Sequence, residues 1–182
     1  ITGGEVTITD CRPAHLRMEL RKLEDSGCQV ERGEDWFRIE GPPRPAPVDF
    51  ATLPYPGFHT DMHPQMVAFL SVASGVSVIT ENLYDARFRY VGELARMGAD
   101  ISVEGPHAVI RGVDQLQGCP VLAPDIRAGA ALVIAGLRAE GVTEVGEIHH
   151  IDRGYEDFAG RLASLGASIE RSVADSTPPG RP

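Results

Sequence analysis

An internal repeat limits what this 182-residue chain can fold into more than any other feature of its sequence. Three segments end in the same way, with a leucine-containing helical stretch, a glycine and a short strand-like run. A unit this short cannot bury its own apolar faces, so several units must pack together with their helices inward. The three matching segments read LEDSGCQVE, LARMGADISVE and LASLGASIE.

Apolar periodicity and turn residues predict the order strand, helix, strand, helix and hairpin within each unit. The first helix starts at Asp10 or Pro13 and ends at Gly27, which suits a helix C-terminus. The segment 128–139 is almost entirely apolar, which predicts a helix buried on every side. The other predicted helices are 62–73, 87–97 and 156–165, and the predicted strands are 5–11, 28–31, 36–40, 76–81, 101–104, 107–111, 121–123, 144–148 and 168–173.

The composition indicates an acidic α/β chain. It carries 17 basic and 26 acidic residues, a net charge of −9, which disfavours nucleic acid and anionic membranes as partners. No apolar run approaches the length of a membrane span. The three cysteines include no CxxC pair, so we expect neither a disulfide framework nor a zinc site, and we expect a reducing, cytoplasmic location.

Residues 1–173 are expected to form one domain, and the end of the chain, 174–182, is expected to be a disordered tail. The chain opens on ITGGEV, which is neither a signal peptide nor preceded by an initiating methionine. We therefore expect it to be a piece of a longer protein or a shortened form of one.

Two aspartates occupy equivalent places in two units, each just before a predicted helix. Asp61 precedes one apolar helix and Asp125 precedes the other. Either carboxylate is suited to cap the helix by accepting hydrogen bonds from the free backbone N–H groups of the first turn. Because Thr60 also has a capping side chain, either residue could cap the helix, which leaves the other available for work such as proton transfer.

Three arginines accompany these acids. Arg87 and Arg153 follow equivalent predicted strands, and Arg127 lies beside Asp125 at a helix start, where free amides favour an anion. A guanidinium group binds a phosphate or carboxylate through two parallel hydrogen bonds. Solvated surface arginines are the alternative interpretation. Together with the aspartates, the arginines indicate a site for an anionic substrate and proton transfer.

The histidines give weaker signals. His149 and His150 are adjacent in a predicted strand and would point to opposite faces, so no metal site is expected there. His59 and His63 flank Asp61 and either tune it or face water. Glycine-rich phosphate loops are absent from the sequence, and we expect no cofactor.

Several segments resemble one enzyme family. They are GGEVTITDCRP, PGFHTDMHPQ, ITENLYDARF, DIRAGAALVIAGL and HHIDRGYE, and the resemblance covers residues 3–171 in unbroken order. The chain is similar to the C-terminal half of UDP-N-acetylglucosamine 1-carboxyvinyltransferases, the MurA family of enolpyruvyl transferases. This resemblance implies an inside-out α/β barrel domain of repeated βαβαββ units, with substrates bound in a cleft between two such domains.

The resemblance also implies a reaction. The enolpyruvyl group of phosphoenolpyruvate is transferred to the 3′-hydroxyl of UDP-N-acetylglucosamine, and phosphate is released. This reaction is the first committed step of peptidoglycan synthesis. Asp61 matches the carboxylate at that hydroxyl, and Leu83 matches a position whose backbone meets the nucleotide sugar. Arg127 and Arg153 match arginines that face the phosphate and carboxylate of phosphoenolpyruvate, and Asp125 orients Arg127 or relays protons. Arg87 completes the expected substrate-binding group.

Two features qualify the resemblance: one concerns the part of the enzyme that is present, and the other concerns the acceptor. The family's reactive cysteine, lysine and one further arginine belong to the other domain, and Cys11, Cys28 and Cys119 do not match that cysteine. The chain is therefore expected to need a missing N-terminal domain as its partner and to be inactive alone. His59 and His63 stand where the family commonly has proline and glutamine. A related enzyme acting on shikimate 3-phosphate or a natural-product nucleotide, or a non-catalytic half-barrel, are the alternatives.

Overall fold

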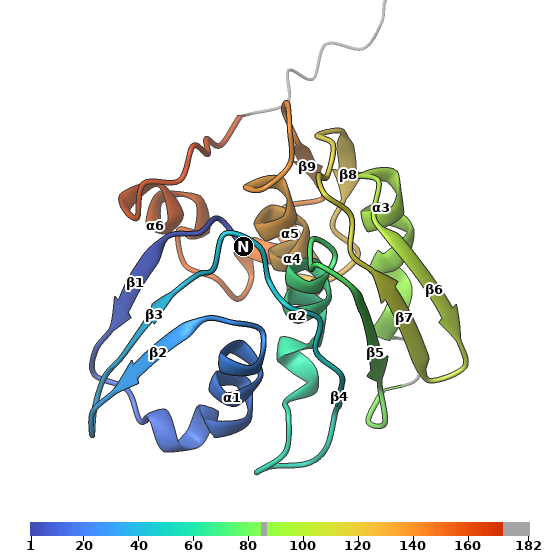
Figure 1. Cartoon of the computed structure of the whole chain (residues 1–182). Helices are drawn as coiled ribbons and strands as arrows, with labels where there is room; N and C mark the ends of the chain where they lie inside the picture. The colour runs from blue at the N-terminus through green and yellow to red at the C-terminus, as the bar shows by residue number, and fades with distance from the viewer. Residues whose placement is uncertain (85–86, 173–182) are drawn as a thin grey trace, which may run out of the picture.

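A computed structural model of the chain describes residues 1–84 and 87–172. The described residues form three sheets arranged around two central helices, α2 (His63–Leu70) and α4 (Ile126–Gly136), which pack against each other (Figure 1). Helices inside and sheets outside are the arrangement that the repeat predicts.

The first sheet is antiparallel and has the strand order β1-β3-β2. Its strands are β1 (Glu5–Ile8), β2 (Gln29–Arg32) and β3 (Phe37–Glu40). Between β1 and β2 lie a 3-10 turn at Pro13–Leu16 and helix α1 (Arg17–Asp25). Gly27 has a φ of 94°, which is the left-handed conformation that ends many helices.

The second sheet has the order β4-β5-β7-β6. The two-residue strand β4 (Phe50–Ala51) runs parallel to β5 (Val76–Thr80). The hairpin of β6 (Asp100–Glu104) and β7 (His107–Arg111) completes it, with β7 antiparallel to both neighbours. The 3-10 turn Arg87–Tyr90 and helix α3 (Val91–Arg96) connect β5 to this hairpin.

The third sheet is a parallel pair of two short strands. Strand β8 (Pro120–Leu122) pairs with β9 (Glu144–Gly146), and α4 connects them. Two helices follow, α5 (His149–Asp152) and α6 (Phe158–Ser164).

The three sheets confirm the repeat. The elements β4, α2, β5, α3, β6 and β7 form one complete βαβαββ unit. The first sheet with α1 repeats the last four elements of that unit, and β1 pairs with β3 as β5 pairs with β7. The third sheet with α4 and α6 repeats the first four elements, and β8 pairs with β9 as β4 pairs with β5.

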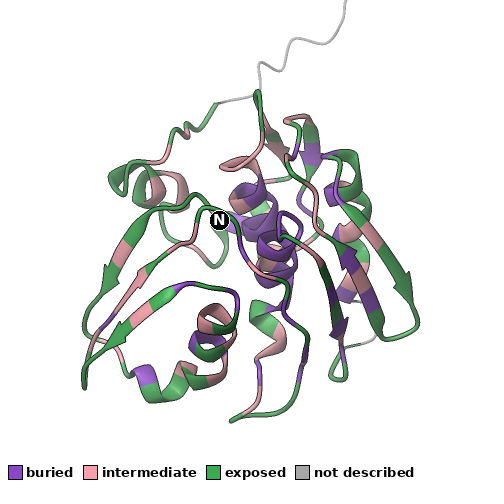
Figure 2. Cartoon of the chain, viewed as in Figure 1, coloured by how far each residue is buried: buried purple, intermediate pink, exposed green. Residues whose placement is uncertain are grey.

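The two central helices form the core. Nearly every residue of α2, and most of α4, is buried, as the purple helices at the centre of Figure 2 show. Val67, Leu70 and Leu132 have no exposed surface. Burial of one such side chain stabilises the fold by roughly 1.5–3 kcal/mol. The prediction of a helix buried on every side is confirmed for α4, except at its two ends.

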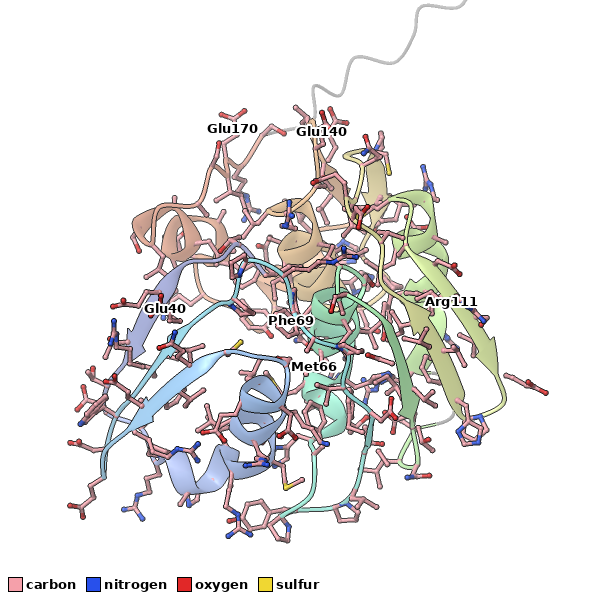
Figure 3. The ribbon with its side chains drawn as sticks, in the orientation of Figure 1. Glu40, Met66, Phe69, Arg111, Glu140 and Glu170 are labelled. Atoms are coloured by element: carbon pink, nitrogen blue, oxygen red, sulfur yellow. The ribbon has the colours of Figure 1, made fainter. Side chains whose placement is uncertain are left out.

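An apolar groove lies between the central helices and the first sheet, and its volume is ≈ 690 Å³. Met66 and Phe69 line it from α2, on the side that faces the first sheet (Figure 3). Ile39 lines it from β3, and Ile134 and Leu137 line it from the end of α4. Strand β1 lies at an edge of its sheet beside this groove.

The predicted strand 168–173 is wrong over its described residues, and the predicted strand 5–11 ends early, at Ile8. Residues 168–172 have no regular structure, and Val173 lies outside the described residues, as does the predicted disordered tail, 174–182. In the other two units, the strands at the place equivalent to 168–173 are β2 and β6. Each pairs with the strand that follows it in a hairpin, β3 and β7 respectively. In the described ranges nothing follows residue 168 that offers such a pairing, and an unpaired strand leaves its backbone groups unsatisfied.

The predicted strand 144–148 is also shorter than expected. Strand β9 stops at Gly146 because Glu147 adopts a left-handed conformation, with φ 56°. His149 and His150 therefore start the short helix α5 and do not alternate across a strand. Within 1–84 and 87–172, no helix is long and apolar enough to cross a membrane.

Replacing Gly112 with alanine is expected to lower the free energy of unfolding by roughly 3 kcal/mol, since overpacking at a rigid site costs this order. A Cβ at Gly112 would lie 2.0 Å from the backbone oxygen of Ala73, which cannot move aside as a flexible side chain would. Urea unfolding measures the change. The matched control is Gly92→Ala in α3, where a Cβ meets nothing within 4 Å. There we expect a gain of about 0.5–1 kcal/mol, and equal unfolding midpoints for the two variants would contradict the packing described.

Candidate functional site

Asp61 lies in the 3-10 turn Thr60–Met62 (η2) that leads into α2. The N-cap position of this turn is His59, and no side chain caps it. The capping interpretation is therefore wrong for both Asp61 and Thr60. The side chain of Asp61 is 62% exposed, so its carboxylate is accessible from solvent.

Two arginines approach this carboxylate. The Nε of Arg127, at the start of α4, donates a hydrogen bond to Oδ1 of Asp61. The Nη2 of Arg87 lies 3.8 Å from the same oxygen. Because α2 and α4 pack together, the equivalent connections of two repeat units place an acid and two guanidinium groups side by side. Two cationic groups and one carboxylate suit a bound anion rather than a metal ion.

Arg87 is buried, so the solvated-surface interpretation is wrong for it. Only 7% of its side chain is exposed. Its Nε donates to Oγ1 of Thr60 at 3.1 Å, and its guanidinium carbon lies 4.7 Å from the centre of the Tyr84 ring. A guanidinium over an aromatic face is held by the ring's electrons. These contacts fix the direction in which Arg87 faces Asp61.

Glu81 is a site residue that the sequence analysis did not single out. It is 4% exposed and follows β5. Its Oε1 accepts hydrogen bonds from Oγ1 of Thr52 at 2.8 Å, and from the backbone N–H groups of Leu83 at 2.8 Å and Tyr84 at 3.1 Å. Its Oε2 accepts a hydrogen bond from Oγ1 of Thr60 at 2.8 Å. One buried carboxylate thus joins three separate segments of the chain.

The charge of Glu81 is stabilised by these donors. Burial alone would raise the pKa of its carboxyl group, but the hydrogen bonds from Thr52, the Leu83 backbone and Thr60 outweigh burial and hold the pKa below its ordinary value. A sequence signal for this residue did exist. In β5 and just beyond it, Ser77, Ile79 and Glu81 alternate with exposed or half-buried residues, so the period of a strand points Glu81 inward.

The carboxylate of Glu81 also faces His63, whose side chain is fully buried in the first turn of α2. The Nδ1 of His63 lies 3.1 Å from Oε2 of Glu81, but the approach is too oblique for a well-formed hydrogen bond. The Nε2 lies 3.5 Å from the hydroxyl of Tyr90. Burial lowers the pKa of His63 to about 4, although the charge of Glu81 opposes this. The imidazole is therefore neutral at pH 7.

The two histidines that flank Asp61 do not face water freely. His63 belongs to the core, as its burial shows. The Nδ1 of His59 lies 2.6 Å from Oε1 of Glu19, and its backbone N–H donates to the same oxygen at 2.9 Å. Both histidines therefore hold the turn in place, and neither contacts Asp61 through an interaction that the described residues show.

The remaining site candidates differ in their surroundings. Asp125 is the N-cap of α4 and accepts from the backbone N–H groups of Arg127 at 2.8 Å and Ala128 at 3.0 Å, so the capping interpretation is correct for it. The side chain of Leu83 is partly exposed, but its backbone N–H is bonded to Glu81.

Arg153 is the C-cap of α5 and is exposed. Its neighbour Gly154 lies against Ile126, which precedes Arg127 at the start of α4. Arg153 is thus on the same side of the molecule as the start of α4. Across the described part of the chain, no ion pair joins Arg153 to an acid, so the structure does not bring it into contact with Asp61.

Lowering the pH from about 7 to about 5 is expected to reduce the free energy of unfolding by on the order of 2 kcal/mol through His63. The unfolded chain protonates this histidine near its ordinary pKa of about 6.5, whereas the folded chain holds the pKa at about 4. The stabilisation is complete above the unfolded pKa and is lost as the pH falls toward the folded value. Urea unfolding at the two pH values measures it.

The control for this experiment is His63→Gln, which has no titrating group at this position. It is expected to lose less stability than the wild type over the same pH interval, since other groups titrate equally in both proteins. Equal losses in the two proteins would show that His63 is not buried in the neutral form.

Comparisons with known proteins agree with this architecture. The family model described as EPSP synthase (3-phosphoshikimate 1-carboxyvinyltransferase) matches residues 1–162. A UDP-N-acetylglucosamine 1-carboxyvinyltransferase of Mycobacterium leprae is 52% identical over 171 residues, which are 94% of this chain and 41% of that protein. A protein of Caldanaerobacter subterraneus, UDP-N-acetylglucosamine 1-carboxyvinyltransferase 2, is also 52% identical, over 172 residues. The chain thus spans about two fifths of the length of the curated relatives it matches.

Solved structures give the same result. The enolpyruvyl transferase NikO from Streptomyces tendae has a TM-score of 0.81 and 27% identity, with 93% of this chain and 41% of NikO covered. EPSP synthase from Acinetobacter baumannii, at 24% identity and a TM-score of 0.62, supports the fold alone. The match over residues 1–162, the enolpyruvyl transferase fold and the repeated units together show that this chain belongs to the EPSP synthase family of carboxyvinyltransferases.

Proposed function

We propose that this chain forms one wall of the active site of a UDP-N-acetylglucosamine 1-carboxyvinyltransferase, the enzyme that commits nucleotide sugar to peptidoglycan synthesis. The observation that carries the proposal is the accessible carboxylate of Asp61 between the guanidinium groups of Arg127 and Arg87. The curated relatives at 52% identity have this activity in their names.

The proposed role of Asp61 is that of general base. The 3′-hydroxyl of the sugar is a poor nucleophile until a base removes its proton as the oxygen attacks carbon 2 of phosphoenolpyruvate. Carbon 3 gains a proton and a tetrahedral intermediate forms. Loss of phosphate and of a proton from carbon 3 then restores the double bond. A carboxylate on a fixed turn at the start of a buried helix is held in one place for the first of these steps.

The arginines supply the positive charge that the substrates require. Both substrates are anionic, and the chain itself has a net charge of −9. A local cationic cluster must therefore bind them. Arg127 is hydrogen-bonded to Asp61 through Nε, which leaves its terminal nitrogens for phosphate or carboxylate oxygens. Arg153 is proposed to approach the same oxygens when substrate is bound, and the cluster would stabilise charge in the transition state.

Glu81 is proposed as a positioning residue that contacts no substrate. Thr60 donates its hydroxyl hydrogen to Glu81 and accepts a hydrogen bond from Arg87, so the buried carboxylate orients the residue next to Asp61. Glu81 also fixes the backbone at Leu83. Because the N–H of Leu83 is bonded to Glu81, its proposed contact with the nucleotide sugar is made through its carbonyl group or side chain.

The rest of the active site is proposed to come from the part of the family enzyme that this chain does not match. Asp61 is open to solvent on this wall. Burial raises the pKa of the Cys28 thiol, which makes it a poor nucleophile. This supports a reactive cysteine in a partner N-terminal domain. The free thiols of Cys11, Cys28 and Cys119 fit the reducing cytoplasm, where we place the enzyme.

One observation favours a second acceptor. The family model that matches the chain has a description that names 3-phosphoshikimate as the acceptor. The identity to the nucleotide-sugar enzymes supports the first acceptor more strongly, since the match to an EPSP synthase structure is only 24% identical. Binding of UDP-N-acetylglucosamine and of shikimate 3-phosphate to the same protein distinguishes the two.

Asp61→Asn is expected to lower kcat by roughly 10²- to 10⁴-fold with a smaller change in KM, because the amide cannot accept the proton of the attacking hydroxyl. The measurement is phosphate release by a chimera in which this chain replaces the matched segment of the Mycobacterium leprae relative. Asp114→Asn is the control, since Asp114 is exposed and pairs only with Arg44 among the described residues. A chimera that keeps full turnover with Asn at position 61 would exclude a base at this position.

The chain by itself is expected to release no phosphate from UDP-N-acetylglucosamine and phosphoenolpyruvate, because it provides only one wall of the site. The assay is the same phosphate measurement on the purified chain, with the chimera as positive control. Turnover by the chain alone would contradict the proposed need for a partner domain.

A further inference from the structure

Three potential metal ligands lie together where β9 passes into α5. Glu147, His149 and His150 each offer one ligand atom, and these atoms lie within 4.8 Å of one another. In the ranges 1–84 and 87–172 this is the one such group of three histidine, cysteine or acidic side chains. None of the three belongs to the cluster around Asp61.

The backbone explains why the three side chains converge. Glu147 is in the left-handed conformation, and its carbonyl oxygen accepts from the N–H of His150 at 3.1 Å. This bond closes the turn that leads into α5, so the side chains before and within the turn share one side of it. The two imidazole rings lie with their centres 4.1 Å apart, and Nδ1 of His149 lies 3.4 Å from Oε2 of Glu147.

One ring nitrogen in the group lacks a partner. The Nδ1 of His150 is shielded from water and has no hydrogen-bond partner among the described residues. A buried polar atom without a partner costs roughly 1–3 kcal/mol, and an ion is one of the ways in which such an atom is satisfied. The side chains of His149 and Glu147 are 67% and 55% exposed, so they are free to move and leave an entry path from solvent.

We propose that Glu147, His149 and His150 form a binding site for one divalent transition-metal ion of the zinc type. Two imidazoles and a carboxylate are a common ligand set for zinc, with water in the fourth position. Bonds of about 2.0–2.1 Å in a tetrahedron place ligand atoms roughly 3.4 Å apart. The ligand atoms of Glu147 and His149 already have this separation, at 3.4 Å. The ligand atom of His150 lies within 4.8 Å of both, so a small side-chain adjustment completes the set.

The neighbouring charges favour the same three ligands. Asp152, the other acid of α5, is held by two hydrogen bonds from Arg171, at 2.9 and 2.7 Å, and does not compete for the ion. A bound ion would tie the end of β9 to α5. The next residue after α5 is Arg153, so the ion would also restrain the backbone that carries this arginine.

The test is direct measurement of Zn²⁺ binding by isothermal titration calorimetry on the full 182-residue chain without an affinity tag. One ion per chain is expected, and Zn²⁺ should raise the Tm of the wild type. His149→Ala, His150→Ala and Glu147→Gln should each weaken binding at least about tenfold, because each removes a ligand. Binding is read out without any enzyme assay, so its failure leaves the proposed transferase function untouched.

His107→Ala is the matched control. His107 is an exposed histidine in β7, beside Thr80 and away from the group. This variant should bind Zn²⁺ as the wild type does. Urea unfolding without metal should show that every variant is folded. The proposal is overturned if the wild type binds no zinc, if the His149→Ala/His150→Ala double variant binds as tightly as the wild type, or if His107→Ala loses affinity to the same extent.

Discussion

The buried carboxylate of Glu81 is the interaction on which the site depends. An unpaired charge in a protein interior is so unfavourable that its partners must be complete, and Glu81 has donors from Thr52, Thr60 and the backbone after β5. These donors come from three separate segments of the chain, around Thr52, Thr60 and Leu83. A shift of any one segment would leave a buried charge short of a partner, so the turn that carries Asp61 has little freedom to move.

The repeat determines where that rigid turn lies. Helices α2 and α4 occupy equivalent places in two units, and their packing against each other brings their first turns together. Asp61 and Arg127 are at these two starts, and Arg87 reaches them from the connection after β5. The symmetry of the units thus converts residues 66 positions apart in the sequence into neighbours. The candidate site thus lies at the joints between elements, while the apolar helix bodies supply the stability.

Most of the elements were predictable from the sequence because their patterns are local: the apolar helix α4, the two hairpins and the glycine that ends α1 follow from periodicity and backbone preference. The convergence of Asp61 with Arg127 followed from the repeat and the family resemblance. Glu81 was missed, and the burial of His63 was not foreseen, because the strong burial of a polar side chain depends on partners from other segments. The strand predicted at 168–173 failed for a related reason, since a strand forms only when another strand pairs with it. The turn at Glu147 was not predicted because the sequence pattern of 144–148 is that of a strand, whereas the left-handed φ of Glu147 ends the strand at Gly146.

The groove lined by Met66, Phe69 and Ile134 has a consequence for how this polypeptide behaves in water. Hydrophobic surface of this kind next to the unpaired edge of β1 is a place where molecules adhere to one another. Self-association in solution will therefore depend on the protein concentration and on whether another polypeptide segment covers the groove. The net negative charge opposes such adhesion through mutual repulsion, and added salt weakens that protection.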